Sequence, residues 1–176
     1  KLLKEAKYPE LFEQMRLVNQ SRYFTFLSEQ FRLQHTSGVY KRFIRALCKL
    51  PNVYIVTTNV DEALEHSLPE HSTIQRSDIE RLPQLLHQRS RFICKLHGSA
   101  SSVESMVFSK SDYELLQLNS AYLEAMRTIF SNTTVLFLGY GLRDEYVFQN
   151  LQTCSTIRPL FGTGPHFIVT SEERNE

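Results

Sequence analysis

Polar residues that can take part in catalysis follow three short apolar segments of this 176-residue chain. Val53 to Val56 is followed by Thr57, Thr58, Asn59 and Asp61. The segment "RFICKL" is followed by His97, Gly98 and Ser99, and "VLFL" by Gly139, Tyr140 and Gly141. An amide, a carboxylate and an imidazole can together orient a substrate, hold water and move a proton near neutral pH. Their recurrence after three segments favours one shared site.

The elements that must position these residues are strands alternating with helices. Runs of β-branched and other apolar residues predict strands near 53–57, 92–96, 135–138 and 166–169. Amphipathic stretches between them predict crossover helices. The expected fold class is therefore α/β, a Rossmann-like doubly wound parallel sheet with helices on both faces. Ligands of such sheets bind at the carboxyl ends of the strands, which is where the polar residues lie.

The helical stretches have recognisable boundaries. Residues 1–50 have helical periodicity throughout, and Pro9 is expected to open a helix. Ser109 and Asp112 predict a capping box, with aspartate where glutamate or glutamine is more usual. Further helices are expected over 121–130 and 144–152. Residues 67–90, which contain Pro69 and Pro83, are expected to form a loop with a short helix.

Each polar signal also has a purely structural interpretation. Asn59 and Asp61 can cap the helix that follows them. His97 can be a hydrogen-bonded turn residue, and the Gly-Tyr-Gly at 139–141 can be a strand-to-helix turn that needs a positive φ. The clustering at predicted strand ends favours the functional interpretation, and both interpretations stay open.

The composition and net charge of the chain argue against several classes of protein. Twenty basic residues against 19 acidic ones give a net charge of +1, which predicts no nucleic-acid partner and no membrane surface. No apolar run reaches the roughly 20 residues of a spanning helix. The three cysteines lie far apart, without a disulfide framework or a C-x-x-C pair. Two of them lie in apolar surroundings and predict buried thiols in a reducing, cytoplasmic setting. The histidines have no metal-ligand spacing, so no metal is expected.

Three motifs, "TTNVD", "KLHGS" and "FLGYGLRDE", occur in that order and resemble the sirtuin-like NAD-binding domain. The resemblance is to its divergent branch in bacterial anti-phage defence and stress proteins, and it covers roughly residues 39–170. It implies one sirtuin-like domain over 1–176, with a helical part at 1–50 and the sheet and its crossover helices at 51–176. It also implies NAD, or an ADP-ribose derivative, as the bound partner and a possible homo-oligomer.

The resemblance implies a role for each site residue. Asn59 would orient the water and the nicotinamide ribose, Asp61 would position the nicotinamide end, and His97 would act as general base. Cofactor-binding roles would fall to their sequence neighbours and to the third motif: Thr57, Thr58, Gly98, Ser99, Gly139, Tyr140 and Gly141. Expelling nicotinamide leaves an oxocarbenium-like ribose, and such a site needs oriented polar groups around it.

Departures from the family narrow the expected activity. The four-cysteine zinc module of ordinary sirtuin deacylases cannot be built here, so we expect an NAD glycohydrolase that releases nicotinamide and ADP-ribose in a defence or stress system. The family's first strand and its Gly-Ala-Gly-x-Ser/Thr loop do not occur in the sequence, so we expect a fragment. Gly141 replaces a serine common in the branch. The alternatives are a degenerate nucleotide-binding or assembly module and an NAD-dependent protein deacylase.

Overall fold

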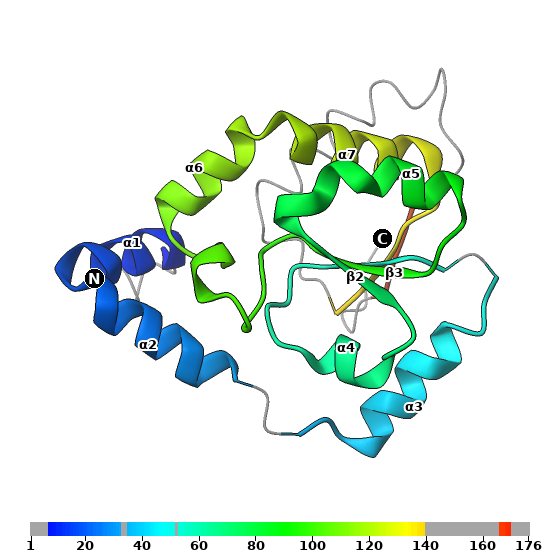
Figure 1. The fold of residues 1–176 in the computed structure, drawn as a ribbon, viewed down its shortest axis with the longest axis horizontal. Helices are drawn as coiled ribbons and strands as arrows, with labels where there is room; N and C mark the ends of the chain where they lie inside the picture. The colour runs from blue at the N-terminus through cyan, green and yellow to red at the C-terminus, as the bar shows by residue number, and fades with distance from the viewer. Residues whose placement is uncertain (1–6, 33–34, 52, 140–165, 170–176) are drawn as a thin grey trace, which may run out of the picture. The chain divides into compact units, whose positions relative to one another are not determined.

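A computed structural model describes residues 7–32, 35–51, 53–139 and 166–169 of the chain. The chain divides into two compact units, Lys1–Leu118 and Asn119–Glu176. The first unit contains a three-stranded sheet with its surrounding helices (Figure 1). The described part of the second unit contains one helix and a pair of strands. None of the described helices combines the length and the apolar character that crossing a lipid bilayer requires.

The sheet of the first unit is parallel, as predicted. Strands β1 (Ile55–Thr57), β3 (Phe92–Lys95) and β2 (Ser72–Gln75) lie in the order β1-β3-β2. The central strand β3 is buried along its whole length. Thr57 pairs with Lys95, and Lys95 pairs with Gln75, so the last residues of the three strands lie in one row. The loops that follow therefore leave the sheet at the same edge.

Helices cover this sheet from two sides. Helices α3 (Gly38–Leu47) and α4 (Ala63–Ser67) share one apolar cluster with the central strand, built from Cys48, Leu64, Leu68 and Ile93. Figure 1 shows α5 (Leu82–His87) on the other side of the strands. The predicted α/β class with a parallel sheet is confirmed.

For residues 67–90, the prediction of a short helix is confirmed by α5, and the prediction that the rest is a loop was wrong. This segment contains strand β2, then the 3₁₀ helix η1 (Arg76–Arg81), then α5. Strand β2 is the edge strand of the described sheet, and Ile74 is its one buried residue, so its sequence lacks the apolar alternation of a half-buried strand. Pro83 lies in the first turn of α5, where proline is tolerated, and it begins a helix.

The amino-terminal helices pack against the loops that follow β1 and β3. Helix α1 (Tyr8–Val18) has Pro9 in its first turn, as predicted, and α2 (Gln20–Phe31) follows it directly. Tyr23 and Leu27 of α2 share an apolar cluster with Val60 and Met106, which lie in those two loops. Burial, and then the charge of Asp112, raise the pKa of Tyr23 to about 12. The helical part thus supports the loops that carry the polar residues.

Helix α6 (Lys110–Leu118) begins with the predicted capping box. The Ser109 amide donates to Asp112 Oδ2 at 2.9 Å, and the Asp112 amide donates to Ser109 Oγ at 3.3 Å. Arg16 of α1 donates to Asp112 Oδ1 at 2.9 Å, and Glu13 accepts from the Ser111 amide at 3.0 Å. Burial raises the pKa of Glu13, but hydrogen bonds from Ser111 and Ser109, with the Arg16 charge, lower it by more. Glu13 therefore stays ionised at the start of α6, where a negative charge is favoured.

The described part of the second unit follows the predicted order. Helix α7 (Ser120–Asn132) spans the expected helix, and the Asn119 side chain caps it by accepting from the Tyr122 amide at 3.0 Å. Strands β4 (Leu136–Leu138) and β5 (Phe167–Val169) are parallel neighbours, with Leu136 opposite Phe167. The helix predicted over 144–152 lies outside the described residues.

Candidate functional site

The loops that follow β1 and β3 are hydrogen-bonded to each other at both ends. The Leu96 amide donates to the Thr57 carbonyl at 2.9 Å, and the Ala100 amide donates to the Val60 carbonyl at 2.7 Å. On the first loop, Asn59 lies between the bonded residues Thr57 and Val60. On the second loop, His97 lies between the bonded residues Leu96 and Ala100. Two of the predicted polar groups are therefore carried on backbones that run side by side at the carboxyl edge.

Asn59 lies in a tight turn whose backbone is fixed from within. Its amide donates to Thr57 Oγ1 at 3.0 Å, a hydroxyl turn of the kind that often ends a strand. Thr57 and Thr58 are half-buried, whereas Asn59 is exposed. The turn thus leaves the Asn59 side chain accessible while using the Thr57 hydroxyl to hold its shape.

Asp61 has the structural role that its sequence position allowed. Its Oδ1 accepts from the Ala63 amide at 2.9 Å, at the first residue of α4. Glu62, the residue immediately before α4, makes no capping bond with its own side chain. The helix-start interpretation therefore holds for Asp61, and a role toward NAD remains a proposal.

His97 is buried and held by an aromatic neighbour. The exposed fraction of the residue is 5%, and its ring meets the Tyr113 ring edge-on, with centroids 5.5 Å apart and planes at 89°. The Val107 amide donates to the His97 carbonyl at 3.1 Å. A residue just past a predicted strand, as His97 is, is expected to lie in a loop, where truncating its side chain would cost little packing. That expectation was wrong, because this ring belongs to the core.

Gly98 is required by packing. Its φ is +81°, and a Cβ there would lie 2.2 Å from the Ser105 carbonyl oxygen. Ser99 is bonded to the same segment, since its amide donates to Ser105 Oγ at 3.1 Å. The buried Ser99 hydroxyl is hydrogen-bonded to the Ser101 hydroxyl at 2.9 Å. The loop after β3 therefore closes back on itself through Ser105.

The third predicted group belongs to the other unit. Gly139 follows β4 and has a φ of +62°, a backbone conformation that favours glycine and agrees with the structural interpretation of this position. Tyr140 and Gly141 lie outside the described residues. The first unit thus brings together two of the three predicted polar groups, 57–61 and 97–99.

Residues 53–176 match the family model of the SIR2-like domain, which is more than half of the chain. The chain belongs to the SIR2-like family. The match begins just before β1 and includes both loops of the site, whereas α1, α2 and α3 precede it. The family resemblance inferred from the three motifs is confirmed.

One curated relative of this SIR2-like chain is the NAD(+) hydrolase ThsA of Acinetobacter baumannii (strain 532279). The two are 29% identical over 114 residues. The aligned region covers 61% of this chain and 24% of the relative, so the chain spans about a quarter of that protein's length.

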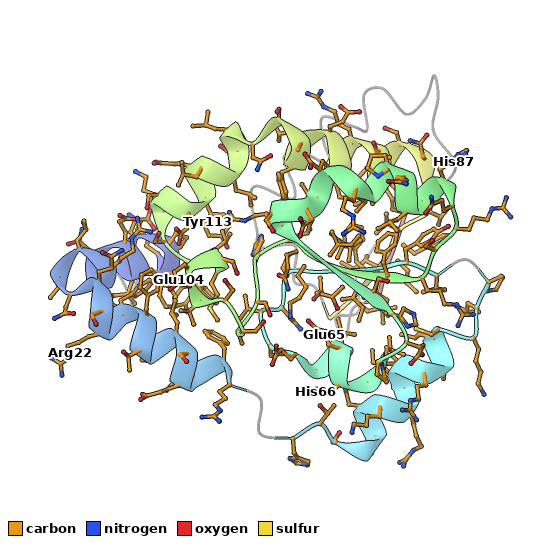
Figure 2. The ribbon with its side chains drawn as sticks, in the orientation of Figure 1. Arg22, Glu65, His66, His87, Glu104 and Tyr113 are labelled. Atoms are coloured by element: carbon orange, nitrogen blue, oxygen red, sulfur yellow. The ribbon has the colours of Figure 1, made fainter. Side chains whose placement is uncertain are left out.

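The SIR2-like site contains a residue that the motifs did not single out. Lys95, the last residue of β3, has an exposed fraction of 0%, and its Nζ lies 2.8 Å from Glu65 Oε1. Figure 2 shows Glu65 on α4. The available signal was a lysine inside the apolar run "RFICKL", because a charged residue is almost never fully buried unless it is paired.

Two further polar residues, Gln75 and Arg76, lie at the same edge of the sheet. Arg76 follows β2, and its guanidinium donates to the Ser105 carbonyl at 3.2 Å, the carbonyl that faces Gly98. Gln75 pairs with Lys95 across the sheet. Sequence reasoning missed both because it did not predict strand β2.

Two cysteines of the domain are buried thiols, as the sequence led us to expect. Cys48 and Cys94 are free and buried, and burial raises the pKa of the Cys94 thiol to about 12. Cys154 lies outside the described residues. Within the described ranges, no three side chains of histidine, cysteine, aspartate or glutamate gather as a metal site would require.

Proposed function

We propose that this SIR2-like domain cleaves NAD to nicotinamide and ADP-ribose. The observation that carries the proposal is the pairing of the Asn59 and His97 loops, which are bonded at both ends on one sheet edge. Membership of the SIR2-like family and similarity to an NAD(+) hydrolase support the same chemistry. NAD is thus the proposed substrate, without a metal.

In the proposed reaction, Asn59 and His97 have separate roles. The bond between the nicotinamide nitrogen and the ribose C1′ breaks, and nicotinamide leaves with the bonding electron pair. The Asn59 amide orients the ribose and the water, whose oxygen forms the new bond to C1′. The water's proton passes to the His97 imidazole, a type of side chain that commonly acts as a general base. Polar groups around C1′ stabilise its developing positive charge.

The remaining site residues have supporting roles in the proposal. Thr57, Thr58, Gly98 and Ser99 bind the nicotinamide-ribose end of NAD, and Asp61 positions the nicotinamide. From the motif resemblance, Gly139, Tyr140 and Gly141 are proposed to bind the adenosine half of NAD. A cytoplasmic defence or stress system and a homo-oligomer are the setting that the motifs imply, and both remain proposals.

A second candidate is a module that binds the nucleotide, or mediates assembly, without cleaving NAD. The capping bond that the Ala63 amide donates to Asp61 Oδ1 favours this candidate, because it gives Asp61 a structural role. The two candidates differ in one measurable product, nicotinamide.

Chromatography of the products of the protein that contains this chain decides between them. We expect nicotinamide and ADP-ribose to appear in equal amounts when NAD alone is added. Nicotinamide release that requires an acyl-lysine peptide would instead show a deacylase. NAD binding without any release would show the non-catalytic module and contradict the hydrolase.

A further inference from the structure

The Val60 carbonyl is one of the two points at which the loops of the site are hydrogen-bonded to each other. It accepts from the Ala100 amide at 2.7 Å and from Lys95 Nζ at 3.3 Å. Lys95 Nζ also donates to the Asp61 carbonyl, and it forms its ion pair with Glu65. One buried ammonium therefore reaches two consecutive carbonyls of the loop that carries Asn59.

Burying a lysine is unfavourable unless partners replace its lost hydration. Here Val60, Asp61 and Glu65 supply three acceptors for the three N–H donors of the ammonium. By contrast, Lys110 and Glu114 form an exposed pair on α6, with their charged atoms 3.8 Å apart. An exposed pair needs no such set of acceptors. The buried arrangement is built around the backbone of residues 60 and 61.

Helix α3 places the Tyr40 side chain near the Lys95–Glu65 pair. Burial raises the pKa of Tyr40, and the negative charges of Asp61 and Glu65 raise it further. Tyr40 also packs against the apolar cluster that contains Leu64 of α4 and Ile93 of β3. The buried Lys95 ammonium thus lies among packed elements, with the partly exposed Glu65 carboxylate beside it.

We propose that the Lys95–Glu65 pair positions Asn59 for catalysis by fixing the carbonyls of Val60 and Asp61. The inference rests on the proposed NAD cleavage, in which Asn59 acts on the substrate. Lys95 acts through the backbone next to Asn59, so it is a positioning residue. Losing it should lower kcat and leave KM nearly unchanged, because a small displacement of a catalytic group can cost about 100-fold in rate.

The test replaces both partners at once in the protein that contains this chain. The Lys95→Met, Glu65→Met double variant keeps the side-chain volume and leaves no uncompensated charge, a change that folded proteins often tolerate. Lys110→Met is the matched control, since it removes a lysine from an exposed pair. Measurements are kcat and KM for nicotinamide release per folded molecule, and amide hydrogen exchange over residues 58–66.

We expect the double variant to lose about 100-fold in kcat, to keep KM within about threefold, and to exchange faster over 58–66. Lys110→Met should match wild type in each measurement. Wild-type kcat and wild-type exchange in the folded double variant would overturn the positioning role. If the double variant does not fold, Glu65→Gln replaces it, with faster exchange over 58–66 expected and unchanged exchange contradicting the role. If wild type releases no nicotinamide, the hydrolase proposal fails, and exchange alone decides the role of Lys95.

Discussion

Replacing Asn59 by alanine is expected to reduce nicotinamide release by about 100-fold or more while leaving the melting temperature unchanged. Oriented polar groups at a charge-developing centre are worth about 10² to 10³ in rate. The Asn59 side chain is exposed, and the backbone bond from its amide to Thr57 Oγ1 survives the substitution. Stability should therefore change by no more than about 0.5 kcal/mol. Product chromatography beside a thermal melt measures both.

Asn132→Ala is the matched control for that experiment. Asn132 is also an exposed asparagine, at the end of α7, so its loss should alter neither rate nor melting temperature. Wild-type release by Asn59→Ala would place the chemistry elsewhere. His97 needs a different substitution, His97→Gln, because the buried ring packs on Tyr113 and alanine would open a cavity.

Gly98→Ala is expected to destabilise the protein far more than the same change at Gly139. Both glycines have positive φ, which costs an alanine about 1 to 2 kcal/mol. At Gly98 the new Cβ would also lie 2.2 Å from the Ser105 carbonyl oxygen, so the backbone must shift. At Gly139 no atom of the described residues lies within 4 Å of the new Cβ. We expect a total loss of about 3 kcal/mol or more at Gly98.

Thermal melts of the two glycine variants measure this difference. A loss of 3 kcal/mol corresponds to a fall of roughly 6 to 12 °C in Tm for a chain of this size. Gly139→Ala should lower Tm by about a third to two thirds as much, because only the positive φ disfavours alanine there. Equal shifts at the two positions would show that contact with Ser105 contributes nothing.

The sequence predicted those parts of the site that depend on local pattern. The β-branched run before Thr57 and the apolar run before His97 identified two strands and the edge at which they end. Ser109 and Asp112 identified the start of α6, because a capping box is a contact between residues three positions apart. In these cases the physical cause lies within a few residues of its effect.

Contacts between distant segments could not be read in the same way. Gly98 looked like a cofactor-binding glycine, and its close contact with the Ser105 backbone emerges only when the loop folds back. Lys95 looked like an interruption of a strand, and its partners Glu65 and Val60 lie about 30 residues earlier in the chain. Strand β2 was missed because pairing with β3 defines it, while its own residues are mostly polar.

A crystal structure of the protein that contains this chain, bound to a carbocyclic NAD analogue, tests the central claim most directly. Such an analogue keeps the ribose hydroxyls but cannot lose nicotinamide, so it marks the reacting centre. We expect the Asn59 amide and the His97 imidazole each to lie within about 3.2 Å of a polar atom of the nicotinamide-ribose end. An analogue bound away from the carboxyl edge of β1 and β3, or with only one of these side chains at the ribose, would contradict the claim.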